Sequence, residues 1–216
     1  FNLLRKLPET QSRGKVRRPR ASLSGRRHTI DRDKQAVRYH YDVSNDFYAL
    51  WLDSNMVYSC GYFLQESDPI AQAQIQKMDL ICRKLRLRSG QRLLDLGCGW
   101  GGLVIYAAQH YNVDATGITL SQPQADFANR RIEELGLGGK CRVLVQDYRE
   151  LSEKDPFDVL VSVGMFEHVG SKLLPTYFEK AYKLLKTHGV FLNHGISSTI
   201  TVDNNPRGSF SDSYVF

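Results

Sequence analysis

A run of glycines contains the residues of this chain that are best suited to hold a ligand. Glycines stand at positions 97, 99, 101 and 102, and Asp95 stands two residues before the first of them. A strand that turns sharply into a helix needs residues without a Cβ, because the backbone bends there and a ligand must approach it closely. An acid at that place suits a ligand that carries an ammonium group.

The spacing of the glycines indicates which nucleotide binds. The pattern Asp-x-Gly-x-Gly-x-Gly differs from the Gly-x-Gly-x-x-Gly of dinucleotide-binding proteins, because its third glycine comes one residue early. An ammonium group on a nucleoside points to S-adenosylmethionine (SAM), whose aminoacyl end is a zwitterion. We therefore predict that Gly97 and Gly99 approach the methionine part of SAM, with Asp95 behind them.

Strands and helices are predicted to alternate after residue 91. Such alternation is typical of an α/β fold with a doubly wound, mostly parallel sheet, in which ligands lie at the carboxyl ends of the strands. Candidate site residues fall at these ends, among them Thr119, Asp147, Glu167 and His194. The expected strands cover residues 92–96, 113–119, 141–146, 157–164 and 189–193, and the expected helices cover 103–111, 122–135 and 173–185.

The segment before this core is dense in aromatic and polar side chains. We expect short helices over 35–41 and 44–51 to form a lid on a pocket, because the polar groups there are costly to bury without hydrogen-bond partners. Residues 70–84 have the apolar spacing of an amphipathic helix, with Ile75 and Met78 on its buried face.

Basic residues are concentrated at one end of the chain. Residues 1–34 hold eleven Lys and Arg against three acids, a net charge of +8, whereas the remaining 182 residues carry 18 basic and 20 acidic groups. The segment is poor in apolar periodicity, so we expect a flexible arm or linker. An interdomain linker and contact with anionic lipid head groups both stay open. Nucleic acid is not expected, since no aromatic residues are interleaved with the charges.

The cysteines and the hydropathy bear on localisation. The four cysteines have no metal-binding spacing, which predicts no metal site and free thiols in a reducing compartment. No apolar run approaches the length that crosses a bilayer. We therefore expect a cytoplasmic protein that touches membranes only peripherally.

Five further segments resemble one enzyme family. Together with the glycine turn, they are similar to the cyclopropane-fatty-acyl-phospholipid synthases and the related mycolic acid cyclopropane synthases over roughly residues 35–216. The segments are 40–48 (HYDVSNDFY), 58–60 (YSC), 119–124 (TLSQPQ), 166–170 (FEHVG) and 193–196 (NHGI).

The resemblance implies a class I SAM-dependent methyltransferase fold and a specific reaction. A methyl group would pass from SAM to the cis double bond of an unsaturated phospholipid acyl chain. The resulting carbocation would lose a proton to bound bicarbonate and give a cyclopropane ring or a methyl branch. In this family the bicarbonate is held by the residues that match Glu167 and His194 and by the backbone near Cys60 and Ile196.

The resemblance also implies how the rest of SAM is held. No acid follows the second predicted strand, where many SAM enzymes grip the ribose, and the family uses other residues there. Residues 58 and 59 would close over the cofactor and residues 147 and 148 would border the adenine. The residues so implied are Tyr58, Ser59, Thr119, Leu120, Gln124, Asp147 and Tyr148.

Three domains of different character are predicted: the basic arm (1–34), the helical lid and N-terminal extension (35–90) and the SAM-binding core (91–216). The family extends beyond residue 216, so we expect both ends of this chain to be cut and C-terminal strands to be missing. Two other functions stay open, a SAM-dependent N-methyltransferase acting on a small amine and an inactive SAM-binding module. The sequence leaves a homodimer open.

Overall fold

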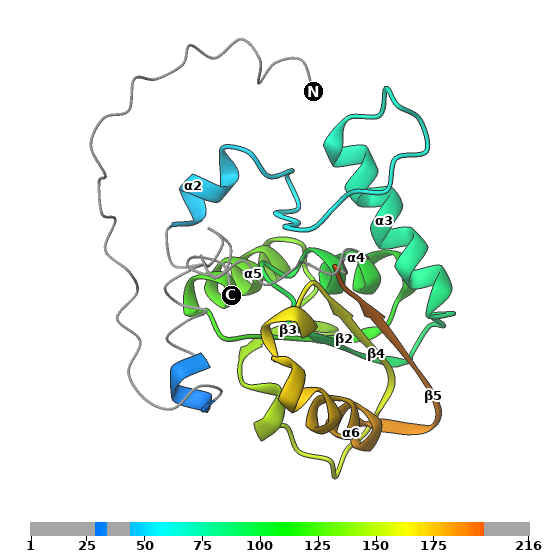
Figure 1. Cartoon of the computed structure of the whole chain (residues 1–216). Coiled ribbons are helices and arrows are strands. Elements are labelled where there is room, and N and C mark those ends of the chain that lie inside the picture. Colours follow the sequence, from blue (N-terminus) through cyan, green and yellow to red (C-terminus); the bar gives the residue numbers. More distant parts are fainter. Residues whose placement is uncertain (1–28, 34–43, 197–216) are drawn as a thin grey trace, which may run out of the picture.

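A parallel sheet of five strands forms the frame of the described part of the chain, which in this computed structural model comprises residues 29–33 and 44–196. Neighbouring strands are parallel and lie in the order β3-β2-β1-β4-β5 (Figure 1). The order reverses between β1 and β4, which is where open α/β sheets bind ligands. The strands are β1 (Arg92–Leu96), β2 (Asp114–Thr119), β3 (Cys141–Val145), β4 (Phe157–Val163) and β5 (Leu185–His194).

Helices cover both faces of the sheet, as a doubly wound fold requires. Successive side chains of a strand point to opposite faces, so Leu93 packs with α3 (Ile70–Lys84), α4 (Gly102–Tyr111) and α5 (Gln122–Glu134), whereas Leu94 packs with α6 (Leu174–Leu184). Each face therefore has its own buried apolar cluster. The predicted fold class is confirmed.

A short helix, α2 (Asn45–Ala49), lies against the glycine turn. Its Tyr48 is buried with Trp100, and their ring centroids are 4.8 Å apart. Trp100 Nε1 donates a hydrogen bond to Asn45 Oδ1 at 2.7 Å. These contacts fix α2 beside the start of α4. Within residues 44–196 there are also three single-turn 3₁₀ helices, η2 (Tyr148–Glu150), η3 (Phe166–His168) and η4 (Ser171–Leu173).

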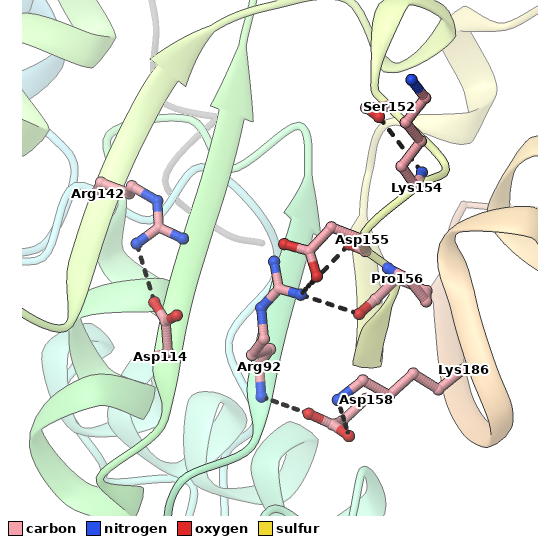
Figure 2. Close-up of polar contacts among 9 residues, drawn as sticks. All are labelled: Arg92, Asp114, Arg142, Ser152, Lys154, Asp155, Pro156, Asp158 and Lys186. Carbon is pink, nitrogen blue, oxygen red and sulfur yellow. Dashed lines mark hydrogen bonds and ion pairs between the residues drawn. The ribbon is translucent and has the colours of Figure 1, made fainter.

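Charged residues at the amino ends of the strands are paired with one another (Figure 2). Arg142 and Asp114 form an ion pair at 3.0 Å between β3 and β2. Asp158 of β4 accepts hydrogen bonds from Lys186 Nζ and from the Arg92 backbone N–H, both at 2.8 Å. These pairs satisfy the polar groups named here, and they hold the strands together at this edge.

The sequence-predicted elements match the structure except in a few places. β5 begins at Leu185 instead of residue 189, because Leu185 pairs with Phe157 before the chain bulges and Val190 pairs with Val159. The second lid helix ends at Ala49, two residues earlier than expected. The expected helix over 35–41 lies outside the described residues, as do most of residues 1–34. Within residues 29–33 and 44–196, no helix has the length and apolarity to span a bilayer.

Candidate functional site

In the glycine turn, Gly97 packs against a neighbouring side chain, whereas Gly99 faces open space. Gly97 and Gly99 both have positive φ angles, 88° and 55°. A Cβ at Gly97 would lie 2.8 Å from the Met165 side chain, so this glycine allows close packing against the loop after β4. A Cβ at Gly99 would meet nothing within 4 Å, and the same holds for Gly164 at the end of β4. The backbone of two adjacent strand ends is therefore accessible to a ligand.

Asp95 is buried beneath this turn with an unsatisfied oxygen. Its carboxyl is 3% exposed, and its Oδ1 has no hydrogen-bond partner among the described residues. Burial raises the pKa of Asp95 to about 7, and the nearby Lys77 ammonium opposes this increase. A buried carboxylate is stable only when a cation or a donor pairs with it. This site therefore suits the ammonium group that the sequence predicted for the ligand.

Glu167 follows β4 in η3, and His194 is the last residue of the neighbouring strand β5. Glu167 Oε1 accepts a hydrogen bond from the Ile196 backbone N–H at 2.6 Å, and the Gly164 N–H donates to the His194 carbonyl at 2.9 Å. Glu167 Oε2 and His194 Nδ1 are buried, and within the described residues neither has a hydrogen-bond partner. The structure thus joins Glu167 to Ile196, two residues after His194, and it leaves one buried polar atom on each of Glu167 and His194 without a partner among the described residues.

Tyr177 of α6 is buried in the apolar cluster on one face of the sheet, next to the end of β5. Burial raises the pKa of Tyr177 to about 12, and the Asp95 and Glu167 carboxyls contribute to the increase. Both carboxyls therefore lie within electrostatic range of one phenol. The Tyr177 hydroxyl donates to Asn193 Oδ1 at 2.9 Å, next to His194. The Tyr177 hydroxyl is therefore satisfied at the end of β5, on the α6 face of the sheet.

Tyr58, Ser59 and Cys60 lie in the loop between α2 and α3. The Tyr58 ring is half exposed and lies 5.1 Å, centroid to centroid, from the Trp51 ring. Gln74 Nε2 donates to the Ser59 carbonyl at 2.7 Å, and Lys77 Nζ donates to Ser59 Oγ at 2.6 Å. Helix α3 thereby holds this loop. Cys60 is exposed and lies near Lys77.

Thr119, Leu120 and Gln124 follow β2. The Thr119 hydroxyl donates to Gln124 Oε1 at 2.6 Å, and both side chains are buried. The hydroxyl of Ser121, the expected N-cap of α5, accepts from the Gln124 N–H at 3.4 Å. Leu120 is half buried. The structure brings these residues together, and their contact with SAM stays a prediction.

Asp147 and Tyr148 follow β3, and both are buried. Asp147 Oδ2 accepts from an Arg149 guanidinium nitrogen at 2.6 Å, and the same nitrogen reaches Asp33 at 3.0 Å. Tyr148 packs edge-to-face on Tyr177 at 5.4 Å. The Asp147 carboxylate therefore already holds Arg149, and Tyr148 belongs to the apolar cluster under α6. Their contact with adenine stays a prediction.

Sequence reasoning missed Lys77, Gln74 and Tyr177. Lys77 stands four residues before Ile81 and eight before Leu85, so it lies on the buried stripe of α3. A lysine at an apolar position of a helical repeat is visible in the sequence, and it could have indicated a buried functional charge. Tyr177 has no such signal, because a tyrosine on the inner face of a helix is common in a core.

The sheet order, the glycine turn and the buried acid near the end of β1 define a fold of the class I SAM-dependent methyltransferases. Comparison with known proteins narrows the class. Residues 28–216 match the family described as mycolic acid cyclopropane synthetase, and the chain belongs to this family.

Individual relatives are similar over most of this chain. It is 47% identical over 195 residues to a probable fatty acid methyltransferase of Pseudomonas putida, covering 88% of this chain and 49% of the relative. It is 47% identical over 162 residues to the cyclopropane-fatty-acyl-phospholipid synthase of Escherichia coli K12, covering 75% and 41%. A solved structure, mycolic acid cyclopropane synthase CmaA1 complexed with SAH and CTAB, is 38% identical with a TM-score of 0.71, covering 74% and 55%. The chain spans about half the length of these relatives.

Proposed function

We propose that this chain is the SAM-binding part of an enzyme that methylates the cis double bond of unsaturated phospholipid acyl chains and forms a cyclopropane ring or a methyl branch. The observation that carries the proposal is the presence of buried polar atoms without partners on Asp95, Glu167 and His194, at three adjacent strand ends of the described sheet. Buried polar groups are normally satisfied in folded proteins. Three such groups around one region are explained by ligands that bind there.

The residues around the glycine turn fit SAM. Asp95 Oδ1 would accept from the SAM ammonium, and the bare backbone at Gly99 would allow close approach. The relative CmaA1 was solved with SAH, the demethylated product of SAM. When bound, SAM would supply an electrophilic methyl group on a sulfonium.

Glu167 and His194 fit an ion that both accepts and donates hydrogen bonds. Glu167 Oε2 would accept from the hydroxyl of bicarbonate, and the His194 ring would orient the ion. Two anions this close repel unless they share a proton, so Glu167 is suited to bicarbonate rather than to carbonate. Bicarbonate would supply the base that removes a proton after methyl transfer. The Ile196 N–H is bonded to Glu167 here, so it would hold the ion only indirectly.

The aromatic side chains beside the turn suit the carbocation that alkene methylation generates. Water would trap this cation, so the site must exclude water, and aromatic faces stabilise positive charge. Tyr48, Trp51, Tyr58 and Trp100 form a continuous aromatic cluster next to the cofactor region. This environment favours a lipid chain over a small polar amine as the acceptor.

Transfer of a labelled methyl group tests the proposal. The protein is incubated with methyl-labelled SAM and vesicles of dioleoyl phosphatidylglycerol, and the acyl chains are analysed by gas chromatography and mass spectrometry. We expect label in the acyl chains and none with vesicles of the saturated dipalmitoyl lipid. Label that appears only in an added amine would replace the proposal with an N-methyltransferase, and SAM binding without any transfer would indicate a binding module.

Association with the surface of anionic membranes is a further part of the proposal. The +8 charge of residues 1–34 supports it, because each basic residue near an anionic surface contributes about 1 kcal/mol to binding. The domain boundary after residue 34 is proposed on this change in charge, and the boundary after residue 90 is proposed on the start of the alternating strands and helices. A homodimer stays an expectation.

A further inference from the structure

Lys77 is a buried lysine near the proposed cofactor site, and the reaction proposed above does not use it. Its side chain is on the buried side of α3, and the residue is 7% exposed. Lysine is almost never buried to this extent unless it is paired. Burial lowers the pKa of Lys77 to about 8, while Cys60, Asp53 and Asp95 oppose this decrease.

The direction of one hydrogen bond limits what Lys77 does. An ammonium group has three donors and no acceptor, so Ser59 Oγ is the acceptor in its 2.6 Å bond with Lys77 Nζ. The hydroxyl hydrogen of Ser59 is then left to donate in another direction. A hydroxyl that accepts from a cation is polarised and becomes a stronger donor. Ser59 is therefore suited to donate to an anion.

The backbone of Ser59 is held by the same helix. Gln74 Nε2 donates to the Ser59 carbonyl at 2.7 Å and to the Val57 carbonyl at 3.3 Å. Gln74 lies one turn before Lys77 on the buried stripe of α3. Backbone and side chain of Ser59 are thus fixed from one rigid element, which allows a precise donor geometry.

We propose that Lys77 is a positioning residue for the carboxylate of SAM, orienting the Ser59 hydroxyl as its donor while Asp95 takes the ammonium. The inference rests on the proposed function, because the zwitterion belongs to SAM. Lys77 lies within electrostatic range of Asp95. The SAM ammonium would therefore meet the Asp95 carboxylate, and the SAM carboxylate would meet the Ser59 hydroxyl that Lys77 orients. Lys77 acts through Ser59 and touches neither the methyl group nor the acceptor.

A pair of ligands isolates this role. The binding of SAM and of decarboxylated SAM to the whole chain is measured by isothermal titration calorimetry, for the wild type and for Lys77→Met, which keeps the length and packing of the side chain. Without Lys77 the Ser59 hydroxyl would no longer be aimed at the SAM carboxylate, and loss of a hydrogen bond to a charged group weakens binding about tenfold or more. We expect Lys77→Met to weaken SAM by this factor and to leave decarboxylated SAM within about twofold.

Two more variants make the experiment decisive. Ser59→Ala should show the same selectivity for decarboxylated SAM, and it answers the question if Lys77→Met does not fold. Lys84→Met, an exposed position on the same helix, should change neither affinity. Equal weakening of both ligands, or of neither, would overturn the inference while the proposed function stands. A wild type that binds neither ligand would overturn the proposed function and this inference with it.

Discussion

Replacing Asp95 with asparagine should stabilise the protein without its cofactor and abolish tight cofactor binding. Burial raises the pKa of Asp95 from 3.8 to about 7. A raised acid pKa means that the folded protein favours the protonated carboxyl. Between pH 4 and pH 7 the unfolded chain ionises while the folded chain does not, so the free energy of unfolding falls as the pH rises. Asparagine does not titrate and removes this loss.

The size of the effect follows from the shift. A shift of about three pKa units, at 1.36 kcal/mol each, means that Asp95→Asn raises the free energy of unfolding by about 4 kcal/mol at pH 8. At pH 5 only part of the shift counts, and the increase is about 2 kcal/mol. These are upper limits, because Lys77 loses its opposite charge in the variant. For a chain of 216 residues, 1 kcal/mol corresponds to roughly 2–4 °C in Tm, so the increase at pH 8 is on the order of 10 °C.

Thermal unfolding followed by circular dichroism at pH 5 and pH 8, with and without SAH, measures both parts of this prediction. SAH should raise the Tm of the wild type and leave that of Asp95→Asn nearly unchanged. The matched control is Asp114→Asn, which removes a half-exposed ion pair at the opposite edge of the sheet and should shift Tm by a few degrees at most. A Tm of Asp95→Asn below that of the wild type at pH 8, or a difference independent of pH, would refute the reasoning.

Three further changes test other parts of the site. Glu167→Gln keeps an acceptor for the Ile196 N–H, so SAM affinity should stay within about threefold while turnover in the lipid assay falls at least about 100-fold; equal losses in both would contradict this role. Gly99→Ala places a Cβ where a ligand approaches, and we expect SAH affinity to fall more than about tenfold in calorimetry while the left-handed backbone costs only about 1–2 kcal/mol of stability. Removing residues 1–34 should lower the fraction of protein that sediments with anionic vesicles, and lower it more at low than at high salt. An equal decrease at both salt concentrations would mean that the segment serves only as a linker.

Hydropathy and glycine spacing were sufficient to predict the fold, because they follow from local rules. The strands were found from apolar runs, and α3 has the predicted bounds Ile70–Lys84. The buried face of α3 was predicted less well. Ile75 was placed in the core and is 38% exposed, whereas Lys77 is buried, because tertiary contacts with the Ser59 loop override the preference of each side chain.

That Glu167 and Ile196 lie next to each other was predicted only from the family resemblance, because no local sequence pattern indicates it. The two residues are 29 positions apart, and their 2.6 Å hydrogen bond depends on the parallel pairing of β4 with β5. Likewise, nothing near Asp147 signals that its partner Arg149 also pairs with Asp33, because the contact between Asp33 and Arg149 spans 116 residues. Such contacts follow from the tertiary arrangement.

The ion pair between Asp33 and Arg149 affects how the protein responds to ionic strength. Both side chains are largely shielded from water, so added ions weaken their attraction much less than that of exposed charges. A salt concentration that weakens the proposed contact of the upstream basic residues with an anionic lipid surface should therefore leave Asp33 paired with Arg149 of η2. Release of the basic arm in the proposed membrane association and release of Asp33 from Arg149 are thus two separable events.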